Sequence, residues 1–551
     1  MTRSGKKATI RQKRTMDKKM LLAISLSLAV LFVFQKFVTP PAVQTQENAA
    51  REEQSSAEPG AKSEVAPPKA VFTGESGRPA MPLDETDIVM NTDKFAITFS
   101  DAGGAIKKWR LLEYEKNSDE QEELLLQEDS PDRRPFAMRS NVLEGLETKI
   151  CKVNRGENFL EFIVEEPKNI QISKKFMFYN SKDYIELEIN TKNISAASKD
   201  IEYTMTGPSG MVETGEVKGR SFLEVNIKSG DEILRKTAAK NGWTESGDIG
   251  WIAEKNRYFA TILKPMDGVS SAQAQGDKKE GLTTAVTSKK KTLSPGESYT
   301  DAYLMYAGPM DQIRTSAFGY EFEAVINYGW FGGISKILLL ILRFFYKWTH
   351  NWGVAIILLT MLVNAVAFPL TKKSFVSMHR MKNVQPHIQK LKDLHKDNPQ
   401  KLNKEMMELY KKYNVNPFGG CLPMLLQIPI FIALYQGLIK AVELKGASFL
   451  WIKDLATPDA VGLPFSLPVI GAHINILPIL MVGMMFFQQK IQGAAAATTP
   501  EQESQQKMML IMMPVFFGFL FYNMPSGLVL YWLTNTVLMT GEQLFLKKTL
   551  S

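Results

Sequence analysis

The residues of this sequence that could do covalent or metal chemistry lie far apart. There are two cysteines, Cys151 and Cys421, and neither has a second thiol nearby in the sequence. His379, His387 and His395 repeat every eight residues, a spacing that rotates them around a helix and keeps them off a common face. The sequence therefore predicts no metal site, no disulfide framework, no nucleophile paired with a base and no cofactor.

The polar side chains that invite a functional interpretation are uncharged and lie inside long apolar runs. Such a group costs free energy in hydrocarbon unless it is hydrogen-bonded or hydrated. One interpretation is that these groups join helices, each contact contributing roughly 0.6–2 kcal/mol. The other is that they line a shared hydrophilic recess; the residue pattern alone favours the first. The residues are Thr360, Asn364, Gln427, Tyr531, Trp532, Thr534 and Asn535.

Five apolar runs carry these residues, and each is near the roughly twenty residues that a helix needs to cross a bilayer. They are 352–370, 422–438, 474–488, 508–524 and 526–544, inside a predicted core of 350–546. The segment from Lys372 to Lys412 holds eleven basic and four acidic residues, which places it in the cytoplasm. With the N-terminal anchor described next as a sixth span, alternation puts both termini, including the tail 547–551, in the cytoplasm.

The N-terminus predicts an additional span. Residues 1–19 carry eight basic residues and one acidic residue, and residues 20–38 are mostly apolar. The apolar run is longer than a usual signal-peptide core and is followed by Thr39-Pro40-Pro41, so we expect an uncleaved signal anchor and no removal of the segment. Residues 39–87 are rich in Pro, Ala, Glu, Gln and Ser and predict a flexible linker.

Residues 88–318 predict a separate domain outside the cytoplasm. Short runs with alternating polarity are separated by Gly, Asn, Asp and Lys clusters, which is typical of an antiparallel β-sandwich. The expected strands are 95–99, 159–164, 170–178, 184–189, 201–205 and 299–306. The region from 88 to 306 contains no histidine, and its carboxylates have the spacing of solvated strand faces, so no active site is predicted there.

Residues 319–349 contain a short amphipathic helix. Lys336, Arg343 and Lys347 follow one another at offsets of 7 and 4, which forms one stripe on a helix, and apolar residues cover the rest. The run is short for a span and carries three bases. We therefore expect a helix that lies in the membrane interface and contacts lipid; the alternative is a simple lead-in to the next span.

The basic segment 372–415 predicts a helical hairpin. Met381, Val384, Ile388 and Leu391 step by 3, 4 and 3, and a second apolar stripe follows Asn398-Pro399. The hairpin is too polar to enter lipid. Its spacing fits a solvated connector and a docking surface for a cytoplasmic partner equally well, and the bases of the first arm that such a partner would meet are Arg380, Lys382, Lys390 and Lys392.

Several motifs of the C-terminal half resemble the YidC/Oxa family of membrane insertases. The motifs occur in order over about 351–544, and the anchor and large extracytoplasmic domain resemble the Gram-negative form of the family. They are Asn351-Trp352-Gly353, Phe368-Pro369-Leu370-Thr371, Asn416-Pro417-Phe418-Gly419-Gly420-Cys421-Leu422-Pro423, Gln427-Ile428-Pro429-Ile430-Phe431 and Pro525-Ser526-Gly527-Leu528-Val529-Leu530-Tyr531.

The resemblance implies a multidomain protein of the cell inner membrane. It has an anchor helix, a periplasmic all-β sandwich of the supersandwich type, related to sugar-processing domains, and a five-span helical core with a cytoplasmic hairpin. The implied function is insertion and folding of membrane proteins through a hydrophilic groove, alone or with the Sec translocon, without ATP. The implied partners are nascent clients, Sec components, lipids and the ribosome, whose RNA is the one nucleic acid expected as a contact. The rival interpretation is a secondary transporter or channel.

The resemblance also reverses the preference between the two interpretations of the polar residues, in favour of a recess. One position departs from the family pattern: many members carry a basic residue in the groove, usually arginine, where this chain has Asn364. A fixed positive charge that attracts acidic client segments is therefore not expected. We expect the recess to work by hydration and hydrogen bonding, with Thr360, Asn364 and Gln427 contributing.

Overall fold

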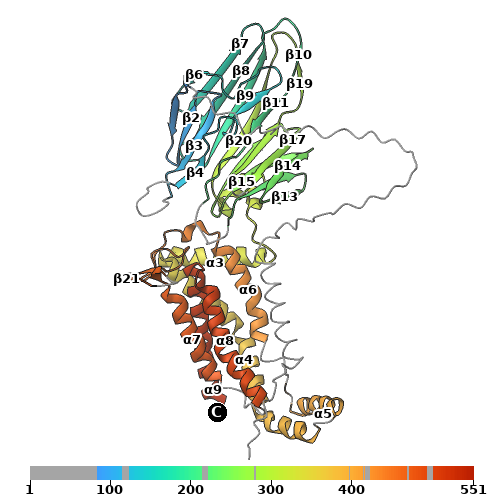
Figure 1. Cartoon of the computed structure of the whole chain (residues 1–551), viewed down its shortest axis with the longest axis vertical. Helices are drawn as coiled ribbons and strands as arrows, with labels where there is room; N and C mark the ends of the chain where they lie inside the picture. Colours follow the sequence, from blue (N-terminus) through green and yellow to red (C-terminus); the bar gives the residue numbers. More distant parts are fainter. Residues whose placement is uncertain are drawn as a thin grey trace, which may run out of the picture. The chain divides into compact units, whose positions relative to one another are not determined.

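The computed structural model describes residues 84–114, 123–213, 221–277, 281–395, 398–413, 415, 422–467, 471–492 and 500–550. The predicted segments 1–19 and 20–38, almost all of the linker 39–87, and Cys421 lie outside the described residues. In the described chain a β-rich domain precedes a helical domain (Figure 1), which confirms that part of the predicted fold.

The β-rich domain is built from antiparallel sheets. A nine-stranded sheet and a five-stranded sheet form two layers, in which β12 and β15 face β14, β17 and β18. The order of the larger sheet is β13 (Glu232–Lys236), β12 (Glu224–Ser229), β15 (Ile249–Lys255), β16 (Phe259–Pro265), β20 (Ser298–Pro309), β9 (Tyr184–Asn193), β8 (Ile170–Phe178), β7 (Phe159–Glu166), β6 (Lys152–Arg155). The order of the smaller is β14 (Ala239–Ser246), β17 (Ser271–Asp277), β18 (Gly281–Thr287), β11 (Tyr203–Thr206), β5 (Met138–Ser140).

Two smaller groups of strands complete this domain. They are a four-stranded sheet, β1 (Asp87–Asn91), β2 (Phe95–Ser100), β3 (Ala105–Leu111), β4 (Glu123–Gln127), and a pair, β10 (Lys199–Ile201) with β19 (Lys291–Leu293). All six strands expected from the sequence are present, as β2, β7, β8, β9, β20 and, for 201–205, the end of β10 with β11.

Alternation along β8 places every second side chain in the core, as a half-buried strand requires. Phe176 of this strand packs against Phe99 of β2, with ring centroids 4.8 Å apart, and against Phe136 at 5.3 Å. Lys174 occupies the same inward row, is only 2% exposed, and donates to the Phe136 carbonyl at 2.7 Å. Burial lowers the pKa of Lys174 to about 8.

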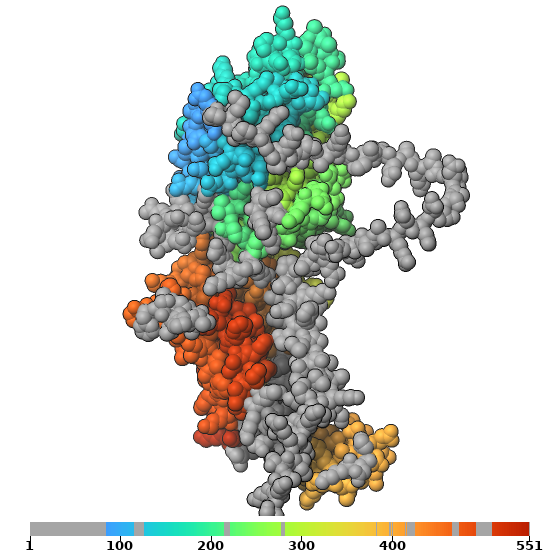
Figure 2. Space-filling model, in the orientation of Figure 1, coloured from blue at the N-terminus to red at the C-terminus, as the bar shows by residue number. Residues whose placement is uncertain are grey.

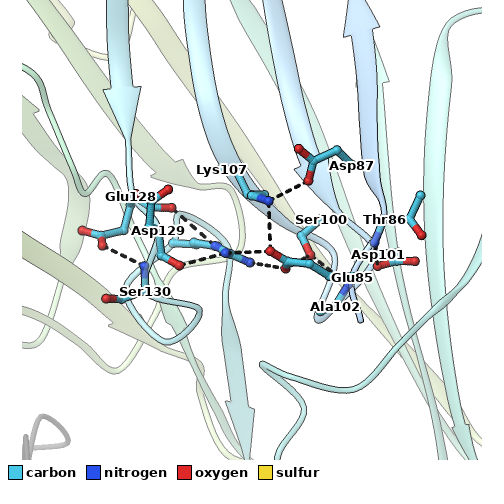
Figure 3. Close-up of polar contacts among 11 residues, drawn as sticks. Glu85, Thr86, Asp87, Ser100, Asp101, Ala102, Lys107, Glu128, Asp129 and Ser130 are labelled. Atoms are coloured by element: carbon cyan, nitrogen blue, oxygen red, sulfur yellow. Dashed lines mark hydrogen bonds and ion pairs between the residues drawn. The ribbon is translucent and has the colours of Figure 1, made fainter. Parts of the chain in front are cut away.

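An ion-pair cluster holds the start of the described chain against this domain (Figure 3). The Glu85 carboxylate accepts two hydrogen bonds from the Arg134 guanidinium, at 2.6 and 3.1 Å, and one from Ser100 at 2.6 Å. Lys107 bridges Glu85 at 2.9 Å and Asp87 at 2.7 Å. The hydrogen bond from Arg134 is the main reason that the pKa of Glu85 falls to about 2.

The helical domain contains seven described helices of eight residues or more. They are α3 (Gly332–Thr349), α4 (Trp352–Leu394), α5 (Pro399–Lys412), α6 (Leu422–Leu438), α7 (Ile476–Gln492), α8 (Pro500–Phe521) and α9 (Ser526–Leu550). Among the described residues, one helical segment, Trp352–Met381, is long and apolar enough to cross a membrane; shorter apolar segments lie in α6, α7 and α8. The number of spans stays a prediction.

Helix α4 continues well past the predicted end of the first span. Its N-terminus is capped by Asn351, whose side chain accepts from the Val354 amide at 3.0 Å. The helix runs without interruption past Pro369 and Pro386, so the predicted span and the first arm of the hairpin form one element. The end of α4 and α5 form a lobe, yellow-orange in Figure 2.

Candidate functional site

Helix α9 connects the polar side chains that the sequence singles out. It lies beside α4 and α6 (Figure 1). Asn535 of α9 accepts a hydrogen bond from the Asn364 side-chain amide of α4 at 2.9 Å, and the same amide nitrogen donates to the Thr360 carbonyl at 2.9 Å. One turn earlier on α9, the Tyr531 hydroxyl accepts from the Gln427 amide of α6 at 2.6 Å. The structure thus brings five of the seven predicted residues together.

These groups are buried and their hydrogen bonds are made within the protein. Thr360 and Tyr531 are 0% exposed, Asn535 is 4% and Asn364 is 7% exposed, whereas Gln427 is half-buried. The Thr360 hydroxyl donates back to the Ile356 carbonyl at 2.7 Å. In the described state the pairs therefore join helices, and access to them requires α9 to separate from α4 or α6.

The pairs belong to a longer buried row that sequence reasoning missed. On α4 the row adds Thr371 and Ser374, which follow Thr360 and Asn364 at steps of 7 and 3 and share their helix face. We call this row on α4, together with Asn535, Tyr531 and Gln427, the polar seam; Thr536, Thr540 and Gln543 are also buried but lie on another face of α9. None of the buried side chains described in α4, α6 and α9 is charged.

The remaining two predicted residues of this group have other surroundings. Trp532 packs in an aromatic cluster between α6, α8 and α9: its ring lies 4.9 Å from Phe431, 5.2 Å from Phe521 and 5.5 Å from Phe517, centroid to centroid. Thr534 is half-buried. Trp532 therefore stabilises the contact between these helices in the described state.

The chemistry available at the polar seam is hydrogen bonding. Its amide and hydroxyl groups can donate and accept, but they offer no acid, base or nucleophile of useful pKa. Among the described residues there is no group of three His, Cys, Asp or Glu side chains that could hold a metal ion. In the described state these hydrogen bonds are made between helices of the protein itself.

The three bases of α3 lie in different surroundings. Lys336 and Lys347 are exposed, whereas Arg343 is half-buried and pairs with Asp311 at 2.8 Å and with Glu443. The same helix exposes large apolar side chains, with Leu340 67% exposed. The exposed part of the stripe thus consists of the two lysines, and Arg343 instead ties α3 to its neighbours.

The hairpin closes through polar contacts between its arms. His395 lies 2.9 Å from the Glu405 carboxylate, and the Tyr413 hydroxyl lies 3.2 Å from His387. Val384 of the predicted apolar stripe is 1% exposed. The bases predicted for docking all lie on α4: Arg380 and Lys390 are exposed, Lys392 is half-buried, and Lys382 belongs to the same helix.

A buried arginine of the β-rich domain was not predicted. Arg257 is 1% exposed and donates to the carbonyls of Ile439 at 2.8 Å and Ala456 at 2.9 Å, both in the segment between α6 and α7. The guanidinium carbon of Arg257 lies 4.7 Å from the centroid of the Tyr258 ring. Nothing in the local sequence distinguishes this arginine from the solvated bases around it.

Comparisons with known proteins match both domains. The family described as YidC periplasmic domain matches residues 178–341, and the family described as 60Kd inner membrane protein matches 344–551. Membrane protein insertase YidC of Pelobacter propionicus is 33% identical over 558 residues, covering 97% of this chain and 99% of that protein. Its counterpart in Geotalea daltonii is 31% identical over 559 residues, covering 97% and 100%.

The comparison with solved structures gives a fainter likeness. A crystal structure of an active YidC insertase with its first transmembrane domain resolved matches 84% of this chain and 93% of that chain, at 17% identity and a TM-score of 0.32. The two matched family ranges meet inside α3, and the second contains α4 to α9.

Proposed function

This chain belongs to the YidC family of membrane protein insertases, which have a periplasmic domain, and from that premise we propose that it inserts and folds inner-membrane proteins through a hydrophilic groove that opens along the polar seam. The observation that carries the proposal is the set of uncharged, hydrogen-bonded pairs that α9 makes with α4 and α6. The groove needs no ATP, and it works alone or beside the Sec translocon.

The mechanism is an exchange of hydrogen bonds. A charged residue at mid-bilayer costs roughly 2.5–3.5 kcal/mol on insertion scales, whereas one interhelical hydrogen bond contributes roughly 0.6–2 kcal/mol. A polar client segment that replaces the Asn364–Asn535 and Gln427–Tyr531 bonds makes hydrogen bonds of the same kind. It therefore recovers most of the free energy that is lost when the polar seam opens. The exchange is close to balanced in free energy, so burial of the client's apolar helix in lipid can drive the step.

Exposed apolar side chains on the faces of α8 and α6 that point away from α9 supply an apolar wall along which that helix can leave. On α8, Phe519 is 83% exposed and Val515 is 53% exposed; on α6, Leu425 is 62% exposed. A client helix can exchange contacts with these side chains for contacts with lipid at little cost, because both surroundings are apolar. The polar and apolar parts of a client are thus handled by different surfaces of the same group of helices.

Asn364 stands where many family members carry a basic residue, and it sets the expected client preference. An amide pairs with donors and acceptors alike, so the sign of a client's charge matters little. In reconstituted vesicles, two clients that differ only in acidic or basic residues of the translocated segment should insert at rates within a few-fold of each other. A strong preference for the acidic client would contradict an uncharged groove.

We further propose that the hairpin contacts the ribosome and that α3 contacts lipid. Arg380, Lys382, Lys390 and Lys392 offer positive charge to ribosomal RNA. Replacing all four with glutamine should weaken co-sedimentation with ribosomes and make the remaining binding less sensitive to salt, because fewer counterions are released from the RNA. Unchanged binding would refute the ribosome contact.

Both termini are proposed to be cytoplasmic.

The test of the function itself is reconstitution of the purified chain in vesicles without nucleotide. A single-span client should become protease-protected in proportion to the amount of chain present. The rival function, a secondary transporter or channel, predicts flux of a small solute through the same vesicles. Flux without client insertion would replace the insertase proposal.

A further inference from the structure

A tight turn between α6 and α7 carries two apolar side chains at its tip. Phe449 and Ile452 exchange backbone hydrogen bonds, each 2.9 Å long, which closes a two-residue turn around Leu450 and Trp451. Leu450 is 76% exposed and Trp451 is 40% exposed. We call residues 449–452 the Leu–Trp turn.

The backbone of the Leu–Trp turn is unusual for the residue that occupies it. Leu450 has φ of +52°, in the left-handed region that glycine and asparagine adopt at lower cost. A leucine here is unfavourable for two reasons, because its backbone is strained and its side chain is exposed to water. Such a combination points to a role for the side chain outside the described fold.

The tip is held in place from both sides. A Cβ added at Gly353 would lie 2.1 Å from Cγ of Phe449, so the Phe449 ring sits directly against the first turn of α4. The Trp451 indole donates to the Asp459 carboxylate at 3.2 Å, and the same buried carboxylate accepts from the Leu477 amide at the start of α7, at 2.8 Å. These contacts with α4 and with the start of α7 hold the Leu–Trp turn in place, so its exposed side chains have a fixed position.

The position of the Leu–Trp turn beside α4 indicates what surrounds its exposed side chains. Gly353 is the second residue of Trp352–Met381, the described helical segment that can cross a membrane. The Leu–Trp turn thus lies at the end of that span, at the depth of a membrane–water interface. At the same end, Trp352 stacks on Tyr346 of α3, with ring centroids 4.0 Å apart, and α3 exposes its own apolar side chains.

We propose that the Leu–Trp turn inserts into the interface of the leaflet at the α3 end of α4, as a lipid anchor separate from α3. Leu450 would enter the outer part of the acyl region, and the indole of Trp451 would lie at headgroup level, where Trp is enriched in membrane proteins. The exposed Lys453 beside it can meet a lipid phosphate. The anchor fixes the depth of α4 and does not depend on the groove mechanism.

The test measures depth by electron paramagnetic resonance on the full chain in phosphatidylethanolamine–phosphatidylglycerol nanodiscs. Spin labels are attached at Leu450→Cys or Lys453→Cys in a background with Cys151→Ala and Cys421→Ala, and their accessibility to oxygen and to a water-soluble nickel complex is compared. Glu165→Cys, exposed on β7, is the aqueous reference, and Val366→Cys, 76% exposed on α4, is the lipid reference.

The label at 450 should reach oxygen at least several-fold better, relative to nickel, than the label at 165, while the label at 453 should lie between the two. Equal accessibility at 450 and 165 would overturn the proposal by placing the tip in water. Low accessibility to both reagents at 450 would also overturn it, because a protein partner or a second copy would then cover the tip. Since 450 and 453 are labelled separately, misfolding of one variant leaves the other to decide.

Discussion

Replacing Asn364 with leucine probes the contact between α4 and α9 most directly. The substitution removes a side-chain nitrogen that donates to Asn535 and to the Thr360 carbonyl, each at 2.9 Å. Asn535 is only 4% exposed, so its oxygen loses its partner without gaining water. The free energy of unfolding should fall by roughly 0.6–2 kcal/mol, the usual range for a polar contact between membrane helices.

A double variant separates stability from function. Asn364→Leu with Asn535→Leu leaves neither amide unpaired, and replacing both partners of a buried hydrogen bond with apolar groups is often nearly neutral. The free energy of unfolding of the double variant should therefore return toward that of the parent. Val366→Leu, on an exposed face of the same helix, is the matched control. It should change neither the free energy of unfolding nor the rate of client insertion.

The assay is protease protection of a single-span client in vesicles without nucleotide. If the amide supplies one hydrogen bond to the passing polar segment, losing roughly 0.6–2 kcal/mol slows insertion by about 3- to 30-fold. The double variant should show this loss, because its closed contact is nearly neutral while both client contacts are gone; in the single variant the weakened contact between α4 and α9 makes opening easier and offsets the lost client contact. Parental insertion by the double variant would refute the reasoning and leave the polar seam as a contact between helices.

Three further predictions concern stability of the full chain. Because the pKa of Glu85 is lowered from 4.5 to about 2, Glu85 contributes about 1–3 kcal/mol to the free energy of unfolding above pH 4.5, and this contribution is lost as pH falls toward 2. The free energy of unfolding of Glu85→Gln, measured against pH, should lack this decrease. The pKa of Lys174 is lowered from 10.5 to about 8, so the unfolded chain binds more protons between these values and the parent should gain stability from pH 8 to 10.5, whereas Lys174→Met should not. Gly353→Ala should lower the melting temperature because its Cβ meets the Phe449 ring, whereas Gly541→Ala, in open space on α9, should raise it.

The class of the β-rich domain was predictable because some of its long strands alternate, although many strands, among them β1, β3, β12 and β15 to β18, were not predicted. β8 and β9 bury every second residue over nine and ten positions, a period that can be read directly. Strand β14 was missed, since its sequence AKNGWTES contains Gly242 at φ of +75° and has no alternation. Lys174 breaks the inward row of β8, and only the position of the Phe136 carbonyl explains why a lysine is tolerated there.

The candidate site was predictable as a set of residues and not as a set of pairs. A polar side chain inside an apolar run is visible in the sequence, which is why Asn364 and Gln427 were identified. The partner of Asn364 lies 171 residues away, and no local pattern gives that pairing. Thr371 was missed because threonine fits an apolar helix, where its hydroxyl donates to the preceding turn, here to the Ala367 carbonyl at 3.2 Å. Trp532, predicted to line the recess, packs beside Phe431 in the described state and is half-buried, so its role toward clients stays a prediction.

The central claim is that the polar seam between α4 and α9 opens to receive the polar segment of a client. Photo-crosslinking from position 364, compared with position 366 on the exposed face of the same helix, tests this most directly. With a ribosome-bound single-span client, position 364 should form adducts with the polar residues that flank the client's apolar segment, and position 366 should react with lipid or with the apolar segment itself. Client adducts at 366 with none at 364 would contradict the account.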